Sequence, residues 1–219
     1  LLLKNLIKNF KIKKKDNLMI HSDVFSIIKN FNSPKKTKLI NFVSIFKNAV
    51  GKDGSLLIPA YNYEFIKGKT FDPLNSESHV GYLSNFLLNS KKYPVTNDPI
   101  FRHIVIGKII KKIKNLNDYE LFGKKSIFDF ILKNKFKILC FCCSPNKMTF
   151  IHYIEKQQNV SYRFDKEVEG KIIINKKIKN KKIKYFFGKK KINYNIKHKN
   201  LIGILNKRFF LIEKFLGFN

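Results

Sequence analysis

The stretch SPKKTKLINFVSIFKNAVGKDGSLLIPAY, residues 33–61, predicts a helix that turns sharply into a buried strand. Ser33 suits the N-cap and Pro34 the first turn. Four apolar residues at helical spacing predict a core-facing stripe: Leu39, Phe42, Val43 and Phe46. Gly51 suits the helix end. A short apolar strand that begins NLMI (17–20) precedes it, so the stretch predicts a β-α-β unit with parallel strands and a right-handed crossover.

The rest of the sequence extends this alternation of strands and helices. Further strands are predicted at residues 103–107 and 136–143, and further helices at 79–90, 108–116, 126–134, 148–157 and 201–217. The near-continuous apolar run at 136–143 is typical of a central buried strand. Residues 170–191 alternate apolar with basic residues, which favours a hairpin on one edge of the sheet. We therefore predict a single α/β domain over residues 1–219, with a central mixed sheet flanked by helices in three α/β/α layers.

The formal net charge of +30 is the strongest compositional signal. Almost all basic residues are lysine, and the arginines are Arg102, Arg163 and Arg208. Lys, Asn, Ile and Phe are enriched together, as an AT-rich genome would produce. Nucleic-acid readers usually rely on arginine for bidentate contacts. The charge therefore indicates a solvated basic surface, with an anionic partner as the alternative.

The three cysteines, Cys140, Cys142 and Cys143, lie within LCFCCSP. On a strand, Cys140 and Cys142 would point to one face and Cys143 to the other. Zinc sites need distant partner ligands that this sequence does not supply, so we expect no metal. Buried thiols on a core strand in a reducing compartment are the simplest interpretation.

No stretch approaches 18 uncharged apolar residues, so we expect no membrane span. Residues 1–17 carry lysine within their apolar part and no small-residue cleavage site, unlike a signal peptide. We expect a cytoplasmic protein; the sequence leaves its oligomeric state open.

Polar residues follow three predicted strands, where open α/β sheets bind their ligands. They are His21, Ser22 and Asp23 after the first strand, Tyr61, Asn62 and Tyr63 after the second, with Asp72 beyond, and His152 and Glu155 after residues 136–143. The last two lie three apart on the helix MTFIHYIEKQ (148–157), so they can touch. The predicted core stripe of that helix is Met148, Ile151, Tyr153 and Ile154.

Five segments occur in a recognisable order and spacing: MIHSDV (19–24), VGKDGSLLIPAYNY (50–63), FDPLNSESHVGYLSNFL (71–87), NDPIFRHIVIG (97–107) and MTFIHYIEKQQNVSYR (148–163). Together they resemble the aminoglycoside 3-N-acetyltransferase-like family over about residues 17–165, leaving 166–219 as a divergent C-terminal part. That family includes enzymes that modify aminoglycosides and relatives that acylate amino sugars on nucleotide carriers. The resemblance implies acetyl-CoA as acyl donor and a sugar amine as acceptor.

The resemblance also implies roles for individual residues. The histidine and glutamate of the family pattern T-x-L-H-x-x-E fall on His152 and Glu155, as the catalytic pair. The histidine–serine turn where the family holds CoA falls on His21 and Ser22, with Asp23 adjacent. Chemistry agrees, because an ammonium ion must lose a proton before it attacks a thioester, and a histidine can take that proton. A carboxylate would orient the ring and stabilise the imidazolium.

Each assignment has a structural alternative. His152 could be a hydrogen-bonded structural histidine, and His21 could serve only in packing. We expect Tyr61 and Tyr63 to contact the acceptor. Asp72 and Asp98 each precede a proline, so they either form turns or contact substrate.

Two residues depart from the family pattern H-P-x-x-S. Asp98 replaces its histidine, and Arg102 replaces its serine. Arg102 would either bind a CoA phosphate or obstruct the thiol arm. We expect a nucleotide-linked or surface-polysaccharide amino sugar as acceptor rather than an aminoglycoside, because an anionic acceptor suits a basic surface and polycations prefer acidic pockets.

Two other functions remain open at the level of sequence. One is a nucleic-acid-binding module in which bases stack on Phe186, Phe187 or Tyr194, although no recognised motif supports it. The other is an inactive family member, for which Arg102 and the short C-terminal part are the evidence.

Overall fold

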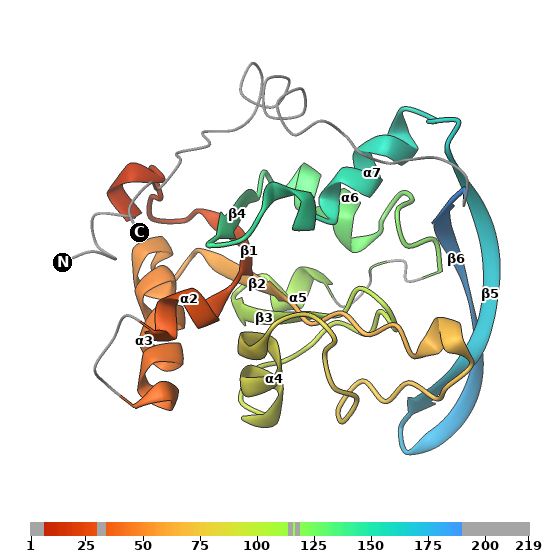
Figure 1. Ribbon diagram of the computed structural model, residues 1–219, viewed down its shortest axis with the longest axis horizontal. Coiled ribbons are helices and arrows are strands. Elements are labelled where there is room, and N and C mark those ends of the chain that lie inside the picture. Colours follow the sequence, from red (N-terminus) through yellow and green to blue (C-terminus); the bar gives the residue numbers. More distant parts are fainter. Residues whose placement is uncertain (1–6, 30–33, 114–115, 117–118, 190–219) are drawn as a thin grey trace.

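The computed structural model describes residues 7–29, 34–113, 116 and 119–189 (Figure 1). The strands are β1 (Asn17–Ser22), β2 (Ser55–Pro59), β3 (His103–Gly107), β4 (Lys137–Phe141), β5 (Arg163–Ile174) and β6 (Lys177–Gly188). The helices are α2 (Val24–Lys29), α3 (Lys35–Val50), α4 (Tyr82–Asn89), α5 (Ile110–Ile113), α6 (Ile127–Lys133) and α7 (Phe150–Gln157), with 3-10 turns η1 (Phe65–Lys67) and η2 (Pro145–Lys147). Within these ranges no helix is long and apolar enough to cross a membrane.

A four-stranded sheet in the order β3-β2-β1-β4 forms the centre of the fold. Strand β1 is parallel to both β2 and β4, and β3 is antiparallel to β2. The predicted mixed sheet, including the parallel pair around α3, is therefore confirmed. Because β1, β2 and β4 run the same way, their carboxyl ends meet at one edge of the sheet.

The alternation of side chains along each strand divides the core in two. Leu18 and Ile20 of β1 pack on the face covered by α3 and α4, whereas Met19 between them packs on the opposite face. Strands β2 and β3 alternate in the same way: Leu57 and Val105 pack on the same face as Met19, and their neighbours along each strand pack on the face of α3 and α4. Helices α6 and α7 and the β5–β6 hairpin contribute to the second core. Helices thus cover both faces of one central sheet, as predicted (Figure 1).

Helix α3 forms where the sequence predicts it. Its predicted apolar stripe is buried, and Gly51 ends it with φ of 70°. Pro34 occupies the N-cap position and makes no side-chain cap hydrogen bond. The predicted cap, Ser33, lies outside the described residues.

Strand β4 lies at the edge of the sheet, so its predicted central position is wrong. Its side chains still alternate between the two cores: Leu139 and Phe141 pack on one side, and Ile138 and Cys140 on the other. An edge strand packed on both faces gives the same apolar run as a central strand, which explains the error. Its cysteines are also less buried than predicted, since Cys142 is exposed and the other two are partly buried.

The hairpin is longer than predicted and does not extend the central sheet. Strands β5 and β6 form their own two-stranded sheet, and Asn175 and Lys176 turn between them with φ of 51° and 63°. The hairpin curves along one side of the molecule (Figure 1). Its inner residues Ile172, Ile183 and Phe186 enter the second core. This packing holds it in place, together with isolated backbone bridges from Phe71 to Ile172 and from Glu120 to Lys184.

Three predicted helices differ in extent or location. The helix predicted at 79–90 begins at Tyr82, after Gly81 with φ of 78°. The one predicted at 108–116 shortens to α5, and that predicted at 201–217 lies outside the described residues. His21 and Ser22, predicted to follow the first strand, are the last two residues of β1. Helix α2, which begins directly after Asp23, was not predicted.

Candidate active site

A cavity of about 710 Å³ lies at the carboxyl ends of the three parallel strands. Its walls come from the residues after β1, the residues after β2, the start of α4 and the segment from Cys142 to Thr149. His21, Ser22, Asp23, Tyr61 and Tyr63 all line it. The structure thus brings five of the predicted site residues together at the sheet edge where α/β folds bind ligands.

His21 presents an unusual polar group to this cavity. Its side chain is buried, and its Nε2 atom has no hydrogen-bond partner among the described residues. Burial lowers the pKa of His21 to about 4, so the ring is neutral near pH 7. The Asp23 side chain, by contrast, accepts a hydrogen bond from the Phe25 backbone N–H at 3.1 Å, at the start of α2. A buried imidazole nitrogen without a partner is the kind of group that a ligand would satisfy.

A second buried histidine, which was not predicted as a site residue, lies next to the cavity-lining Tyr61. His103 is fully buried on β3, and its Nε2 lies 3.5 Å from the Tyr61 hydroxyl. Burial, with a smaller contribution from His21, lowers its pKa to about 3. Tyr61 is also buried and hydrogen-bonds to Thr149, and burial raises its pKa. The only sequence signal for this cluster was a histidine within an otherwise apolar strand.

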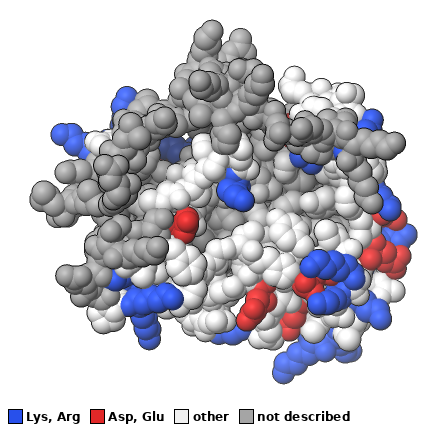
Figure 2. Space-filling model, viewed as in Figure 1, with Lys and Arg blue, Asp and Glu red and all other residues white. Residues whose placement is uncertain are grey.

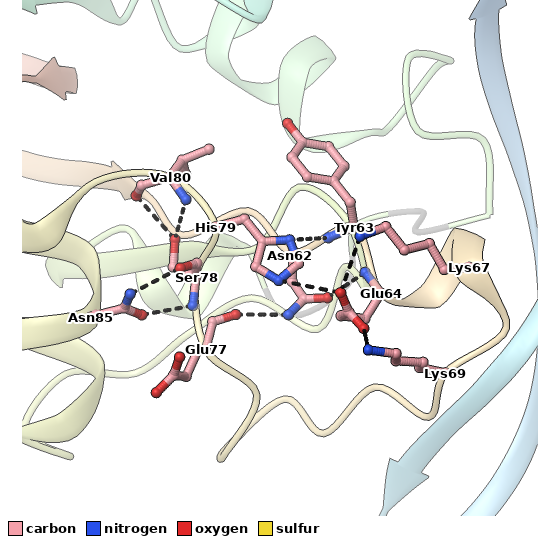
Figure 3. Close-up of polar contacts among 10 residues, drawn as sticks. All are labelled: Asn62, Tyr63, Glu64, Lys67, Lys69, Glu77, Ser78, His79, Val80 and Asn85. Atoms are coloured by element: carbon pink, nitrogen blue, oxygen red, sulfur yellow. Dashed lines mark hydrogen bonds and ion pairs between the residues drawn. The ribbon is translucent and has the colours of Figure 1, made fainter.

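The loop that carries Tyr63 is held by a network of side chains (Figure 3). His79 Nδ1 accepts a hydrogen bond from the Tyr63 backbone N–H at 3.2 Å, and its Nε2 lies 3.6 Å from Glu64 Oε1. Asn62 donates to the Glu77 carbonyl at 2.7 Å and accepts from the Glu64 N–H at 2.8 Å. The phenol ring of Tyr63 points away from these contacts (Figure 3). The network therefore fixes the Tyr63 backbone and leaves its ring at the cavity, where burial raises its pKa to about 12.

His152 and Glu155 touch, as their spacing on the predicted helix requires. His152 Nδ1 lies 2.7 Å from Glu155 Oε2; the histidine side chain is 30% exposed and that of the glutamate 7%. Neither residue lines the cavity itself; the pair begins one turn beyond Thr149, which does, and the His152 N–H donates to the Thr149 carbonyl at 3.0 Å. The His152 ring packs edge-on against the ring of Phe122.

Two residues that were not predicted complete the surroundings of Glu155. Tyr162 donates a hydrogen bond to Oε1 at 3.1 Å, and Arg163 Nε lies 2.7 Å from Oε2. Burial alone would raise the pKa of Glu155, but His152, Arg163 and Tyr162 together lower it below its ordinary value. Glu155 is therefore an ionised carboxylate beneath the ring. Both partners lie in the family-like segment 148–163, but their contact with Glu155 depends on the chain turning from α7 into β5.

The core stripe of α7 differs from the prediction. Phe150, Tyr153 and Glu155 are its buried residues, with Met148 buried just before the helix. Ile154 is 37% exposed, and Ile151 is partly buried. Tyr153 faces inward because its hydroxyl donates to Asp129 at 2.9 Å, a contact that apolar periodicity alone could not reveal.

Arg102 does not face the cavity, and the predicted contact with CoA is corrected accordingly. Its side chain is fully buried and donates to the backbone carbonyls of Ala60, Pro73 and Ser76 at 3.3, 2.7 and 2.6 Å. Burial lowers its pKa to about 10. The guanidinium thus hydrogen-bonds to the chain directly after β2 and to the 72–76 turn. It therefore neither reaches a phosphate nor obstructs the cavity.

The hydrogen bonds of Asp72 and Asp98 support the turn-forming alternative. Asp72 accepts from the Leu74 N–H at 2.8 Å and from the Asn75 side chain at 2.8 Å. Asp98 is buried, and its Oδ1 accepts from the N–H groups of Ile100 and Phe101 at 2.8 and 2.7 Å. Neither residue lines the cavity.

The carboxylates around α7 are paired with cations. Lys156 lies 2.6 Å from Glu120 and 2.8 Å from Asp165, and Lys133 lies 2.7 Å from Asp129. Figure 2 shows the same mixture on the face that it displays, with acidic side chains lying next to basic ones. Within the described ranges, no group of three or more His, Cys, Asp or Glu side chains is placed to hold a metal ion.

Comparison with solved structures places this architecture among known folds. AAC-IIIb in a binary complex with CoASH superposes with a TM-score of 0.76 at 16% identity, over 94% of this chain and 82% of that chain. YokD from Bacillus subtilis gives 0.71 at 16% identity, over 85% and 80% of the two chains. A histidine-to-alanine variant of AAC(3)-IVa in complex with apramycin gives 0.71 at 14% identity, over 94% and 78%.

A search of curated proteins gives no match. The sequence family described as aminoglycoside 3-N-acetyltransferase, however, matches residues 19–200. That range includes β2, β4, α7, most of β1 and all the residues that line the cavity. The match extends over most of the sequence, and the chain belongs to the aminoglycoside 3-N-acetyltransferase family of N-acetyltransferases.

Proposed function

We propose that this protein transfers an acetyl group from acetyl-CoA to the amine of an amino sugar, with His152 as the general base. The observation that carries the proposal is the 2.7 Å contact between His152 Nδ1 and a buried, ionised Glu155. A carboxylate at Nδ1 holds the ring proton on that atom. The lone pair of Nε2 then faces away from Glu155 and is available for a proton.

The reaction needs a proton to leave the acceptor. A sugar amine is an ammonium ion near neutral pH and has no lone pair until it is deprotonated. His152 takes that proton at Nε2, and Glu155 stabilises the resulting imidazolium. Tyr162 and Arg163 hold the carboxylate in position, so the ring keeps one orientation. Acetyl-CoA supplies the activated acyl group as a thioester.

Donor binding is assigned to the cavity at the strand ends. The unpartnered Nε2 of His21 can receive a hydrogen bond from the donor or give one to it, and Ser22 adds a hydroxyl beside it. Lys147 lies on the same wall and can neutralise phosphate charge. These groups suit a polar, anionic cosubstrate. The complex of AAC-IIIb with CoASH supports the same assignment by analogy.

For the acceptor we propose an amino sugar that is not a polycation, such as a nucleotide-linked or surface-polysaccharide one. The support is the pairing of the carboxylates around α7 with lysine and arginine, which leaves little excess negative charge for a polycation. An aminoglycoside is the alternative acceptor, and the apramycin complex of AAC(3)-IVa is the reason to keep it. Tyr61 and Tyr63 are the residues proposed to contact the sugar, because both line the cavity.

The test is a thiol-release assay with acetyl-CoA and a panel of acceptors. The panel contains a nucleotide-diphosphate hexosamine, free glucosamine, sisomicin and apramycin. We expect kcat/KM to be highest for the nucleotide-linked sugar. A preference for the aminoglycosides would overturn the acceptor assignment and keep the reaction. No thiol release with any amine, together with no thermal shift by CoA, would support an inactive member.

A further inference from the structure

The cysteine segment after β4 lies beside the proposed donor site. Cys140 pairs in register with His21 of β1, and the Asp23 N–H donates to the Phe141 carbonyl at 2.9 Å. Cys142 and Cys143 both line the cavity. The segment therefore shares a wall with the residues assigned to the donor.

The backbone brings together two cysteines that an extended strand would keep apart. Three residues of extended chain span about 10 Å and place Cys140 and Cys143 on opposite faces. Instead β4 ends at Phe141, and Cys142 adopts a left-handed conformation with φ of 53°. The chain folds back there, and the thiols of Cys140 and Cys143 hydrogen-bond to each other. The sequence spacing C-x-x-C thus becomes a pair in contact.

The two thiols are electrostatically unequal. The hydrogen bond from Cys140, aided by the charge of Lys147, lowers the pKa of Cys143, although burial and Asp23 oppose this. The same hydrogen bond, with burial, raises the pKa of Cys140. Burial also raises the pKa of Cys142, even though this residue is the exposed one of the three. Reactivity and exposure therefore point to different cysteines.

We propose that Cys140 and Cys143 are an oxidisable dithiol, a modification site that forms an intramolecular disulfide on the wall of the cavity. The oxidant is a peroxide. The Cys143 thiolate attacks one peroxide oxygen, and the O–O bond breaks to give a sulfenic acid at Cys143 and one water. The Cys140 thiol then attacks that sulfur, the S–O bond breaks, and a second water leaves. Two thiols are oxidised, and one peroxide is reduced.

Disulfide formation should also change the cavity. The sulfur atoms must approach to about 2.05 Å with a fixed dihedral angle, which moves Cys143 relative to Asp23 and the neighbouring β1 exit. We expect weaker CoA binding in the oxidised protein. This consequence rests on the proposed function, whereas the disulfide itself does not.

Oxidation of the full chain with hydrogen peroxide tests the site without any substrate. Wild type should lose the mass of two hydrogen atoms and two of its three alkylatable thiols, and a reductant should restore both. Peptide mapping should link Cys140 to Cys143. Cys142→Ser, the matched control, should behave the same way with its two remaining thiols. In Cys140→Ser, dimedone should instead trap a sulfenic acid at Cys143. A vicinal Cys142–Cys143 link, an intermolecular disulfide or equal oxidation of all three thiols would overturn the proposal.

Limited alkylation of the reduced protein gives an independent readout. At pH 7, iodoacetamide should label Cys143 before the more exposed Cys142. Faster labelling of Cys142 would mean that exposure alone decides reactivity and would contradict the proposal.

CoA binding is then compared before and after oxidation in wild type and in Cys140→Ser/Cys143→Ser. If oxidation weakens CoA binding in wild type and not in the double variant, the disulfide changes the cavity as expected. If reduced wild type does not bind CoA, the proposed function fails while the disulfide result stands.

Discussion

A buried carboxylate needs compensating partners, and Glu155 has three. His152, Tyr162 and Arg163 all contact it, and together they keep it ionised despite its burial. The sequence predicted the first contact from the three-residue spacing on one helix. It could not predict the other two, because they form only once β5 folds back beside α7.

Arg102, in contrast to Glu155, does not make the contact that its sequence position suggested. A cation at a position where the family pattern has serine suggested a phosphate ligand, yet its three donor nitrogens bond to backbone carbonyls.

Arg102→Met should lower the free energy of unfolding by about 3 kcal/mol or more, because it leaves those carbonyls unpaired. Urea denaturation measures this. The control Lys108→Met removes a surface ion pair with Asp53 and should cost much less, because solvent screens that pair. An Arg102→Met protein of normal stability with a raised KM for acetyl-CoA would restore the phosphate-binding interpretation.

The buried neutral His21 makes stability depend on pH. Its pKa of about 4 in the folded state lies below its ordinary value of 6.5, so the unfolded chain binds more protons between these values. Stability should therefore fall as the pH drops from about 6.5 to 4, with His21 contributing on the order of 3 kcal/mol. His103 should add a second loss that extends to about pH 3.

His21→Asn tests the contribution of this residue. The variant should show a shallower decline of melting temperature between pH 6.5 and 4 than wild type, since asparagine does not titrate. Parallel curves for wild type and His21→Asn would contradict the buried neutral state.

At the scale of elements, local patterns predicted which segments form strands and helices better than where those segments pack. Helix α3, the β1–β2 pair and α7 follow from periodicity and turn residues. The edge position of β4 and the separate hairpin do not, because residues distant in sequence determine them. Phe71 bridges to Ile172, and Gly170 lies against the ring of Phe65. No alternation within residues 170–191 encodes such contacts.

Gly170→Ala tests how the hairpin docks. A Cβ atom at this position would lie 2.8 Å from the ring of Phe65, which is itself fully buried and cannot move aside easily. We expect a loss of about 1–3 kcal/mol in unfolding free energy from this overpacking. Glu169→Ala, at the exposed neighbouring position, should change stability by less than about 0.5 kcal/mol. Equal stabilities of the two variants would mean that the hairpin is not held against η1.

At the scale of the whole molecule, the net charge of +30 suggests a nucleic-acid interpretation that the described residues do not favour. Phe186, one of the proposed stacking residues, is buried in the second core, and Tyr194 lies outside the described residues. Basic side chains are spread across the face shown in Figure 2, with acidic ones beside some of them. Charge composition therefore says less about function here than the geometry of the cavity does.

DNA binding should accordingly be weak and purely electrostatic. In a fluorescence-anisotropy titration with a single-stranded oligonucleotide, we expect affinity to fall steeply with salt and to disappear by about 0.2 M. Tight binding that survives this salt concentration, with a preference among sequences, would favour a nucleic-acid-binding module instead.

The proposed mechanism requires His152, oriented by Glu155, to remove a proton from the acceptor amine. The most direct test measures turnover and melting temperature on the same preparations of wild type, His152→Ala and Glu155→Gln, with the best acceptor found by thiol release. His152→Ala should lower turnover about 10²–10⁴-fold and retain CoA binding. Glu155→Gln should lower turnover less than His152→Ala does, because the ring keeps a hydrogen-bond partner. A folded His152→Ala protein with wild-type turnover would show that His152 is not the general base.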